Sequence, residues 1–504
     1  MNRQQPFGMD RQQRRQEMLA RRAKRRGEPP DLGPSTAELF QRALADHRAG
    51  RLLQAQAAYR QILSVDPAHV DAHLALGAAL QALGQPAEAE ASFREALRLR
   101  PNYPEAHNNL GIALRDLGRA AEAETSFRES LRLQPNVPVA HNSLGVALKD
   151  LGRPAEAEAS FREALRLQPN YAEAHNNLAH ALLLAGRFEE GWQEYEWRWK
   201  TISVSSDVRD FSAPLWRGEA IGDRTILLHA EQGLGDTLQF CRYAPLMVCG
   251  GRIILEVQPS LVRLLSRLPG VMQTVARGDR LPPFDLHCPL LSLPLAFSTT
   301  LDTIPATTPY LSADPALAAK WQERLVGLGG LRIGLVWAGE QGVNFAAKAA
   351  DDRRRSIALK ALAPLGEVAG VSFVSLQKGG PAAEAADPPH GMMLHDSTAD
   401  LHDFEDTAAL IVNLDLVVSV DTSVAHLAGA LGKPVWLLNR FDTDWRWLLN
   451  RDDSPWYPTL RQFRQPSPGD WNSAVCAARD GLQRLLAGDR RSDAYHAGPA
   501  GPPG

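Results

Sequence analysis

Residues 70–103, VDAHLALGAALQALGQPAEAEASFREALRLRPNY, decide the fold of the first part of the chain. Apolar and small residues recur at helical spacing on both sides of a glycine turn, which predicts two helices joined by that turn. Gly77 and Ala89 are small where the helices would approach closely, and Phe93 would fill the gap between them. Pro101 then stops the second helix. The stretch therefore predicts one helix–turn–helix unit.

The unit recurs with a step of 34 residues. Units begin near Thr36, Val70, Pro104, Pro138 and Ala172. The turn glycines, the aromatic residues of the second helix and the prolines after it keep the same step. This pattern resembles the tetratricopeptide repeat, whose period is 34 residues. The resemblance implies an α-solenoid over 35–204 that binds protein partners.

The last unit departs from the pattern. Gly191 and Arg198 replace small alanines, and Ser203 replaces the proline. The unit gains three tryptophans instead, Trp192, Trp197 and Trp199. A terminal repeat with a changed surface is a cap or a docking joint, and we expect this one to be the joint to the next domain.

Three asparagines occupy the same first-helix position in consecutive units: Asn108, Asn142 and Asn176. Their amides can hydrogen-bond the backbone of an extended peptide, or they can simply solvate an exposed helix face, and the sequence leaves both readings open. The array is similar to that of the nucleocytoplasmic protein O-GlcNAc transferases, in which asparagine ladders hold the acceptor polypeptide. Only three repeats have an asparagine at this position, because Leu74 occupies it in the second repeat.

Composition and charge exclude several classes of protein. The chain has 504 residues, a formal net charge of −3 and 22% charged residues, which disfavours a strongly basic nucleic-acid binder. Residues 1–34 carry nine Lys/Arg and four Asp/Glu. This arm can touch acidic lipid or nucleic acid, but we favour a disordered lead-in, and we expect 489–504 to be a disordered tail.

The cysteines and the hydropathy favour a cytoplasmic protein. The four cysteines contain no C-x-x-C pair, and none lies in the first 200 residues. A reducing compartment is therefore the simpler interpretation. No apolar run reaches the ~18 residues that would suggest a transmembrane segment, and no apolar segment follows the basic N-terminus as in a secretory signal.

After residue 205 the pattern changes to alternating strands and helices. Apolar, β-branched runs lie at Thr225–His229, Arg252–Val257, Leu331–Trp337, Val371–Leu376, Leu416–Val420 and Val435–Leu438. Alternation of this kind is typical of doubly wound parallel sheets. The length suits two Rossmann-like domains, which we place at 205–329 and 330–470.

The first of two informative junctions follows the strand at 225–229. It contains Gly233, Gly235 and Asp236 and runs directly into a helix. It lacks the third glycine of a dinucleotide fingerprint, so a Rossmann dehydrogenase is disfavoured. The two glycines let the backbone approach a ligand, and Asp236 stands at a helix N-terminus beside the expected cleft. The alternative is that Asp236 only caps this helix.

The second junction is Asp421-Thr422-Ser423-x-x-His426, where a buried strand ends and a helix starts. Hydroxyl groups and free N–H groups at a helix N-terminus form an anion site that suits a diphosphate. His426 lies one turn into the helix and can face the same ligand. Taken singly, Asp421 could be a cap and His426 an ordinary helix residue.

Together the two junctions resemble glycosyltransferase family 9, the ADP-heptose:lipopolysaccharide heptosyltransferases, which have the GT-B fold. The resemblance covers roughly 205–488, and its strongest part is Val420-Asp-Thr-x-x-x-His426. One segment departs from the pattern. After Trp337-Ala338-Gly339, an Asn-Pro and a His are expected, but Glu340-Gln341 and a longer stretch to Asp352 follow here.

The resemblance implies an inverting sugar transfer from a nucleotide sugar bound by the second Rossmann-like domain to an acceptor bound by the first. Such a reaction needs a base for the acceptor hydroxyl and positive or N–H groups for the leaving diphosphate. Asp236 is the candidate base, and no acidic cluster predicts a metal site. The candidate donor-binding residues are Asp421, Thr422, Ser423, His426, Arg355 and Lys378. Solvated surface charge is an equal alternative for the last two.

Several alternatives stay open at this level. The acceptor is a polypeptide if the array recruits it, or a saccharide such as lipopolysaccharide core if the catalytic half follows its nearest relatives. A scaffold that has lost its chemistry is the alternative to an enzyme. Five tryptophans between 436 and 471 could stack on a base or sugar, but we favour packing. We expect a final helix at 471–488 to return to the first Rossmann-like domain.

Overall fold

The computed structural model describes residues 35–201, 209–247, 251–339 and 352–488. The chain forms two compact units, residues 1–117 and 118–504. The boundary between these two units lies inside the repeat array, and the domain bounds at 204/205 and 329/330 stay predictions. The physical reason is that the later repeats pack onto the α/β half. The predicted arm, the tail and the stretch from Glu340 to residue 351 lie outside the described residues.

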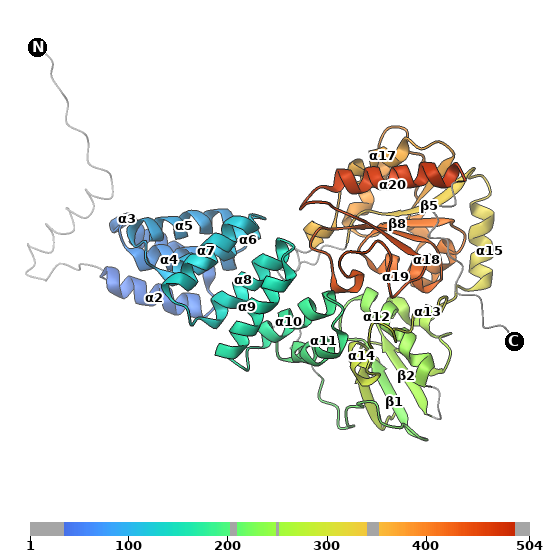
Figure 1. The fold of residues 1–504 in the computed structure, drawn as a ribbon, viewed down its shortest axis with the longest axis horizontal. Coiled ribbons are helices and arrows are strands. Elements are labelled where there is room, and N and C mark those ends of the chain that lie inside the picture. The colour runs from blue at the N-terminus through green and yellow to red at the C-terminus, as the bar shows by residue number, and fades with distance from the viewer. Residues whose placement is uncertain (1–34, 202–208, 248–250, 340–351, 489–504) are drawn as a thin grey trace, which may run out of the picture. The chain divides into compact units, whose positions relative to one another are not determined.

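The first unit consists of paired helices (Figure 1). Its helices are α2 (Thr36–Arg48), α3 (Leu52–Val65), α4 (Val70–Ala82), α5 (Pro86–Leu99) and α6 (Pro104–Asp116). Ser35 and Glu38 form a capping box at the start of α2. A side chain at Gly77 would collide with the Phe93 ring, which is the close approach that the sequence predicts.

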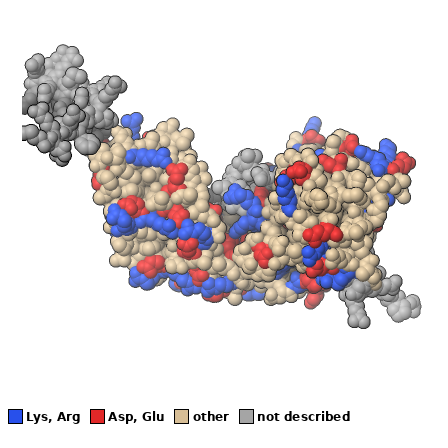
Figure 2. All heavy atoms as spheres, turned by 90° about the horizontal axis from the view of Figure 1, so that it is seen from above, with Lys and Arg blue, Asp and Glu red and all other residues tan. Residues whose placement is uncertain are grey.

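The second unit begins with the remaining repeats. Their helices are α7 (Ala120–Leu133), α8 (Pro138–Asp150), α9 (Pro154–Leu167), α10 (Ala172–Leu184) and α11 (Phe188–Tyr195), followed by the 3₁₀ turn η1 (Glu196–Lys200). A Cβ at Gly145 would lie 2.5 Å from Phe161 Cε1, which repeats the contact of the first unit. The helix pairs confirm the predicted tetratricopeptide fold. Figure 2 shows positive and negative side chains interspersed on the face in view. On α9, Arg166 and Glu163 form an ion pair three residues apart at 2.7 Å.

The last repeat is the predicted joint. The indole N–H of Trp192 donates to the carbonyl of Thr299 at 3.0 Å, and Trp192 is 2% exposed. The preceding repeat has its own contact with the α/β half. Arg354 forms an ion pair with Asp150 at 3.1 Å, and the Phe441 ring packs against Gly152.

The first sheet has four parallel strands in the order β3-β2-β1-β4. The strands are β1 (Thr225–His229), β2 (Arg252–Val257), β3 (Val271–Ala276) and β4 (Leu286–Pro289). The helical segments that connect them are α12 (Leu234–Phe240), η3 (Cys241–Met247), η4 (Pro259–Leu261), α13 (Val262–Leu265), η5 (Leu290–Ser292) and α14 (Leu293–Ala296).

The second sheet has six parallel strands in the order β10-β9-β8-β5-β6-β7. The strands are β5 (Leu331–Val336), β6 (Val371–Ser375), β7 (Leu394–His395), β8 (Leu416–Val420), β9 (Val435–Asn439) and β10 (Leu460–Arg464). Its helical segments are α15 (Pro315–Arg324), η6 (Leu359–Leu362), α17 (Ala363–Gly366), η7 (Gly380–Ala386), η8 (Thr398–Asp400), α18 (Phe404–Ile411), α19 (Ser423–Ala430), η9 (Trp445–Trp447) and α20 (Trp471–Leu486). Two parallel α/β sheets are the predicted GT-B arrangement.

One hydrophobic core joins the last repeat to both sheets. It runs from Leu183 and Trp192 of the array through Leu228 of β1 to Val417 of β8 and Trp445. Trp447 and Trp456 are fully buried in the same core, so these tryptophans have the packing role that we favoured. Helices α12 and α19 contact each other and connect the two sheets directly.

The final helix differs from the expectation. Helix α20 packs on β9, β10 and α17 and not on the first sheet. Its buried residues Val475, Ala478 and Leu482 share a core with Ile333 and Phe373 of the second sheet. The sequence predicted its amphipathic face correctly, but an apolar face does not specify which sheet it covers. No helix within the described residues combines the length and apolarity needed to cross a bilayer.

Candidate functional site

The glycine loop follows β1 and leads into α12. Gly233 occupies the N-cap position, and Asp236 lies three residues later in the first turn. The backbone N–H of Gly233 donates to Oδ2 of Asp236 at 2.8 Å. Asp236 is therefore not the N-cap residue of the alternative reading, but its carboxylate closes the same turn from within the helix.

The second junction lies at the end of β8. The chain leaves the sheet at Val420, Thr422 occupies the N-cap position, and α19 begins at Ser423. The Thr422 hydroxyl bonds the Ser419 hydroxyl at 3.0 Å, and no capping bond forms from its side chain to the helix. The first-turn N–H groups of α19 thus have no side-chain cap from Thr422.

Gly235 brings the two junctions together. A Cβ built at this position would lie 2.9 Å from Cδ2 of His426 and 3.5 Å from Cα of Ser423. Only a residue without a side chain fits between α12 and α19 at this point. The glycine loop of the first sheet and the Asp-Thr-Ser turn of the second therefore lie next to each other between the sheets.

His426 is held in its neutral form. Its Nδ1 bonds the Tyr457 hydroxyl at 2.9 Å, and its ring stacks on Trp447 at a centroid distance of 5.3 Å. Burial and the charge of Arg446 lower the pKa of His426 to about 3. A neutral imidazole at this position can hydrogen-bond a ligand but cannot contribute a positive charge at neutral pH.

Arg446 is the principal residue of the site that the sequence analysis missed. It is 9% exposed, and it forms an ion pair with Oδ1 of Asp236 across the two sheets. It also donates to Oδ1 of Asp444 at 2.9 Å and to Oε1 of Gln239 at 2.8 Å. Burial by itself lowers the pKa of Arg446, but the carboxylates of Asp444 and Asp236 outweigh it and raise that pKa.

Two further carboxylates surround this arginine. Burial alone would raise the pKa of Asp444, but the Arg446 guanidinium outweighs burial and holds that pKa at about 2. Burial and the Asp444 charge raise the pKa of Asp421, while Arg355 opposes them. Asp444 is therefore the firmly ionised partner of Arg446.

The two predicted phosphate partners have different surroundings. Arg355 donates to the backbone carbonyl of Asp421 at 3.1 Å and to Oδ1 of Asp352 at 2.5 Å, so it lies at the Asp-Thr-Ser turn. Lys378 donates to the carbonyls of Thr398 and Leu401 at 2.8 and 2.9 Å. The structure thus places Arg355 beside α19 and gives Lys378 two backbone acceptors elsewhere.

A buried network ties the array to the glycine loop. Arg198 of η1 is 1% exposed and donates to Glu231 at 2.9 Å, to Ser292 at 2.8 Å and to Glu196 at 2.6 Å. The side-chain amide of Gln232 donates to the Tyr195 hydroxyl at 3.2 Å. Burial raises the pKa of Glu231 to about 7 against the charge of Arg198. The end of the array therefore holds the residues that precede Gly233.

The three asparagines lie on first helices, half-buried. Within residues 118–504, the side-chain amide of Asn177 donates to Oδ1 of Asn142 at 2.9 Å. Asn176 lies beside Asn177 on α10. In the first unit the amide of Asn108 donates weakly to Asn109 at 3.4 Å. Asn142 therefore contacts the asparagine next to Asn176 in the following repeat.

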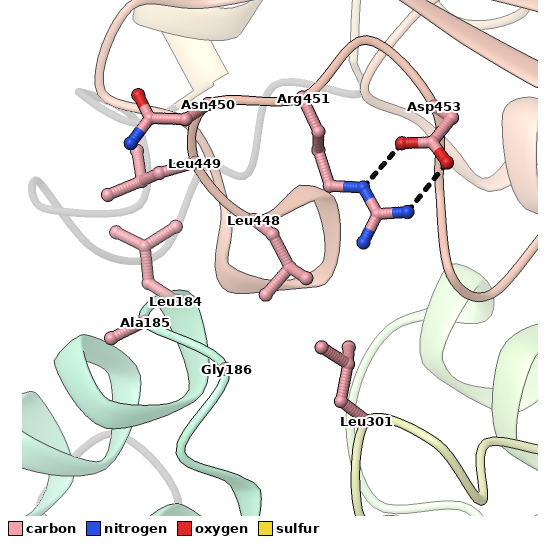
Figure 3. Close-up of a pocket in the computed structure, with 9 residues that line it drawn as sticks. All are labelled: Leu184, Ala185, Gly186, Leu301, Leu448, Leu449, Asn450, Arg451 and Asp453. Carbon is pink, nitrogen blue, oxygen red and sulfur yellow. Dashed lines mark hydrogen bonds and ion pairs between the residues drawn. The ribbon is translucent and has the colours of Figure 1, made fainter.

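A separate cavity lies where the last repeat meets the α/β half (Figure 3). Its volume is about 650 Å³, and leucines from α10, from the loop after α14 and from the loop after η9 line it. The lining residues are Leu184, Ala185, Gly186, Leu301, Leu448, Leu449, Asn450, Arg451 and Asp453. None of the predicted site residues lines it. Across 35–201, 209–247, 251–339 and 352–488, no group of three His, Cys, Asp or Glu side chains is arranged to hold a metal ion.

Comparison with known proteins agrees with this architecture. Residues 74–138 and 142–196 match the tetratricopeptide repeat family, and 401–438 match glycosyltransferase family 9 (heptosyltransferase). The second match includes Asp421, Thr422, Ser423 and His426. The chain therefore contains tetratricopeptide repeats and a C-terminal segment that matches glycosyltransferase family 9.

One curated relative is Protein FlbA of Caulobacter vibrioides, which is 28% identical over 337 residues. The alignment covers 60% of this chain and 54% of that protein, so the chain spans about half the length of this relative. Among solved structures, PilW, described as a type IV pilus biogenesis factor, is 28% identical and covers 34% of this chain and 81% of its own, with a TM-score of 0.32. Pseudomonas aeruginosa pilF is 27% identical and covers 32% of this chain and 74% of its own, with a TM-score of 0.30.

Proposed function

We propose that this protein is an inverting glycosyltransferase that transfers a sugar from a nucleotide-sugar donor to an acceptor recruited by its repeat array. The observation that carries the proposal is the contact of Gly235 with His426 and Ser423. It brings the residue that precedes Asp236 to the start of α19, where Thr422 makes no side-chain cap. A base beside an anion site is the pair of groups that sugar transfer from a diphosphate requires.

The donor side of the site is the Asp421–His426 turn. Hydroxyls of Thr422 and Ser423 and the first-turn N–H groups of α19 would receive the diphosphate. Arg355, which already contacts the Asp421 carbonyl, would supply positive charge there. His426 would donate or accept one hydrogen bond as a neutral ring.

The acceptor side would be formed by the first sheet and the end of the array. Asp236 would take the proton of the acceptor hydroxyl as that oxygen attacks the sugar. Asn108, Asn142 and Asn176 would hold the backbone of an extended polypeptide. A polypeptide acceptor is favoured over a saccharide because the last repeat, a module typical of protein binding, is packed into the core of the α/β half.

The donor-binding part of the proposal is tested by calorimetry with a panel of nucleotide sugars. The double variant Thr422→Ala/Ser423→Ala should bind its donor at least about tenfold more weakly, since each lost hydrogen bond to a charged group is worth about 1.5–3 kcal/mol. Ser473→Ala is a matched control, because Ser473 bonds Asp470 at the start of α20, away from the site. Unchanged donor affinity in the double variant would remove this turn from the site. If the wild type neither binds nor consumes any nucleotide sugar, the glycosyltransferase proposal fails and the scaffold without enzymatic activity is the remaining hypothesis.

A further inference from the structure

Arg446 has acceptors on both sides of the site. Its guanidinium donates hydrogen bonds to Asp236 and Gln239 of α12, and to Asp444, which directly precedes η9. It also stacks over the Trp445 ring, with Cζ 4.2 Å from the ring centroid. Gln239 and Asp444 therefore hold Arg446 in place even without the bond to Asp236.

Both oxygens of Asp236 are occupied. Oδ2 accepts the Gly233 N–H at 2.8 Å, and Oδ1 forms the ion pair with Arg446. Each oxygen of Asp236 thus already accepts a hydrogen bond, and the Arg446 guanidinium occupies Oδ1. In the structure as it stands, Asp236 is therefore not ready to act as a base.

Arg446 lies close to the start of α19. Gly235, the neighbour of Asp236, touches Ser423 and His426. Trp447, the residue after Arg446, stacks on the His426 ring at a centroid distance of 5.3 Å. The charge of Arg446 opposes the net rise in the pKa of Asp421 and contributes to the lowered pKa of His426. A diphosphate at this helix start would thus be within the field of Arg446 and would compete with Asp236 for it.

We infer that Arg446 is a further catalytic residue, which exchanges its bond to Asp236 for one to the diphosphate when the donor binds. This inference rests on the proposed function. The exchange frees Oδ1 of Asp236, so the base becomes active only when a donor is present. The bond between the sugar carbon and the diphosphate oxygen then breaks, with its electron pair going to the leaving diphosphate, which Arg446 stabilises. The acceptor oxygen forms the new bond to that carbon, and its proton passes to Asp236.

The exchange predicts an unusual effect of Asp236→Asn. The substitution removes the carboxylate that competes for Arg446, so a nucleoside diphosphate should bind several-fold more tightly than to the wild type. A nucleoside without phosphates has no group for Arg446, and its affinity should not change. Asp453→Asn is the matched control, because Asp453 forms an exposed pair with Arg451 and lies outside the site. The probes are ADP, GDP, UDP and CDP, measured by calorimetry with adenosine, guanosine, uridine and cytidine beside them.

The reciprocal variant is Arg446→Gln. It should weaken nucleoside-diphosphate binding by at least about tenfold, as expected for a lost charged hydrogen bond. If the melting transition shows that Asp236→Asn does not fold, diphosphate binding by Arg446→Gln alone tests the exchange. Unchanged or weaker diphosphate binding in a folded Asp236→Asn, or unchanged binding in Arg446→Gln, would overturn the exchange. In both cases donor consumption by the wild type would leave the proposed function standing. A wild type without diphosphate binding or donor consumption would overturn both.

Discussion

The Arg198 guanidinium lies 2.9 Å from the Glu231 carboxylate, and both side chains are 1% exposed. The contact joins the end of the repeat array to the residue that opens the glycine loop. Because Gly233 and Asp236 follow within five residues, the last repeat forms part of the support of the candidate site.

This pair predicts a large stability effect of Arg198→Met. The change leaves the Glu231 carboxylate buried without its cation, which typically costs about 3–5 kcal/mol. The measurement is urea unfolding of the full chain. Arg187→Met is the matched control, because Arg187 of the same repeat pairs at the surface with Glu190 and with Glu158 of the preceding repeat, and it should change stability by less than about 0.5 kcal/mol. Similar losses in the two variants would contradict a special role of the Arg198–Glu231 contact.

Gly235→Ala should break the contact between the two sheets. Its Cβ would lie 2.9 Å from the His426 ring, so α12 and α19 would have to move apart. We expect a loss of about 1–3 kcal/mol in stability, as for overpacking, and a severe loss of donor turnover. Gly327→Ala is the control, because nothing lies within 4 Å of a Cβ at that position. Turnover of Gly235→Ala equal to that of the control would mean that the site does not require this approach.

His426 predicts a defined dependence of stability on pH. Its pKa is lowered to about 3 in the folded protein, against about 6.5 for an unfolded histidine. Burying His426 in its neutral form leaves the free energy of unfolding at its full value above about pH 6.5. That stability is lost as the pH falls toward 3, because the unfolded chain then binds the proton and the folded one does not. His426→Gln should therefore lessen the acid-induced loss of unfolding free energy by up to about 1.4 kcal/mol per pH unit between pH 6 and 4. If the free energy of unfolding falls equally with pH in the wild type and in the variant between pH 6 and 4, His426 is not a neutral, buried residue.

The asparagine ladder predicts a separation of two activities. Changing Asn108, Asn142 and Asn176 together to Ala should reduce transfer to a protein acceptor and leave hydrolysis of the donor by water nearly intact. The control replaces Asn102, Asn136 and Asn170, which keep the same 34-residue step but are exposed on the turns between repeats. Equal loss of transfer and hydrolysis in the ladder variant would assign these asparagines a structural role.

The repeat array was predictable from sequence because its signals are local and periodic. The five predicted unit starts coincide with the first residues of α2, α4, α6, α8 and α10. The strands were predictable from local apolar runs only where they are buried. The central strands β1, β5 and β8 were predicted from apolar runs. Strand β3 was missed because it is a partly exposed edge strand, and β10 because its polar residues interrupt the apolar run.

The site was predictable only in part, since its pairings join distant segments. Asp236 and Arg446 lie 210 residues apart, and no spacing rule connects them. The sequence did contain a usable signal, an Asp444-Trp-Arg446-Trp stretch in which charged residues alternate with tryptophans that are too apolar for a surface loop. The helix α20 was misplaced for the same reason, because its partner sheet is set by tertiary packing.

The most direct test of the central claim is the rate of nucleoside-diphosphate release from a nucleotide sugar by the wild type and by Asp236→Asn. The Asn side chain keeps the size and an oxygen for the Gly233 N–H, but it loses the basic carboxylate. General base catalysis contributes typically 10²–10⁴-fold, so we predict release at least about a hundredfold slower in the variant, with donor binding retained. Release that falls only a few-fold would contradict Asp236 as the base and turn attention to Glu231 on the same loop, and no release by the wild type with any nucleotide sugar would contradict the glycosyltransferase itself.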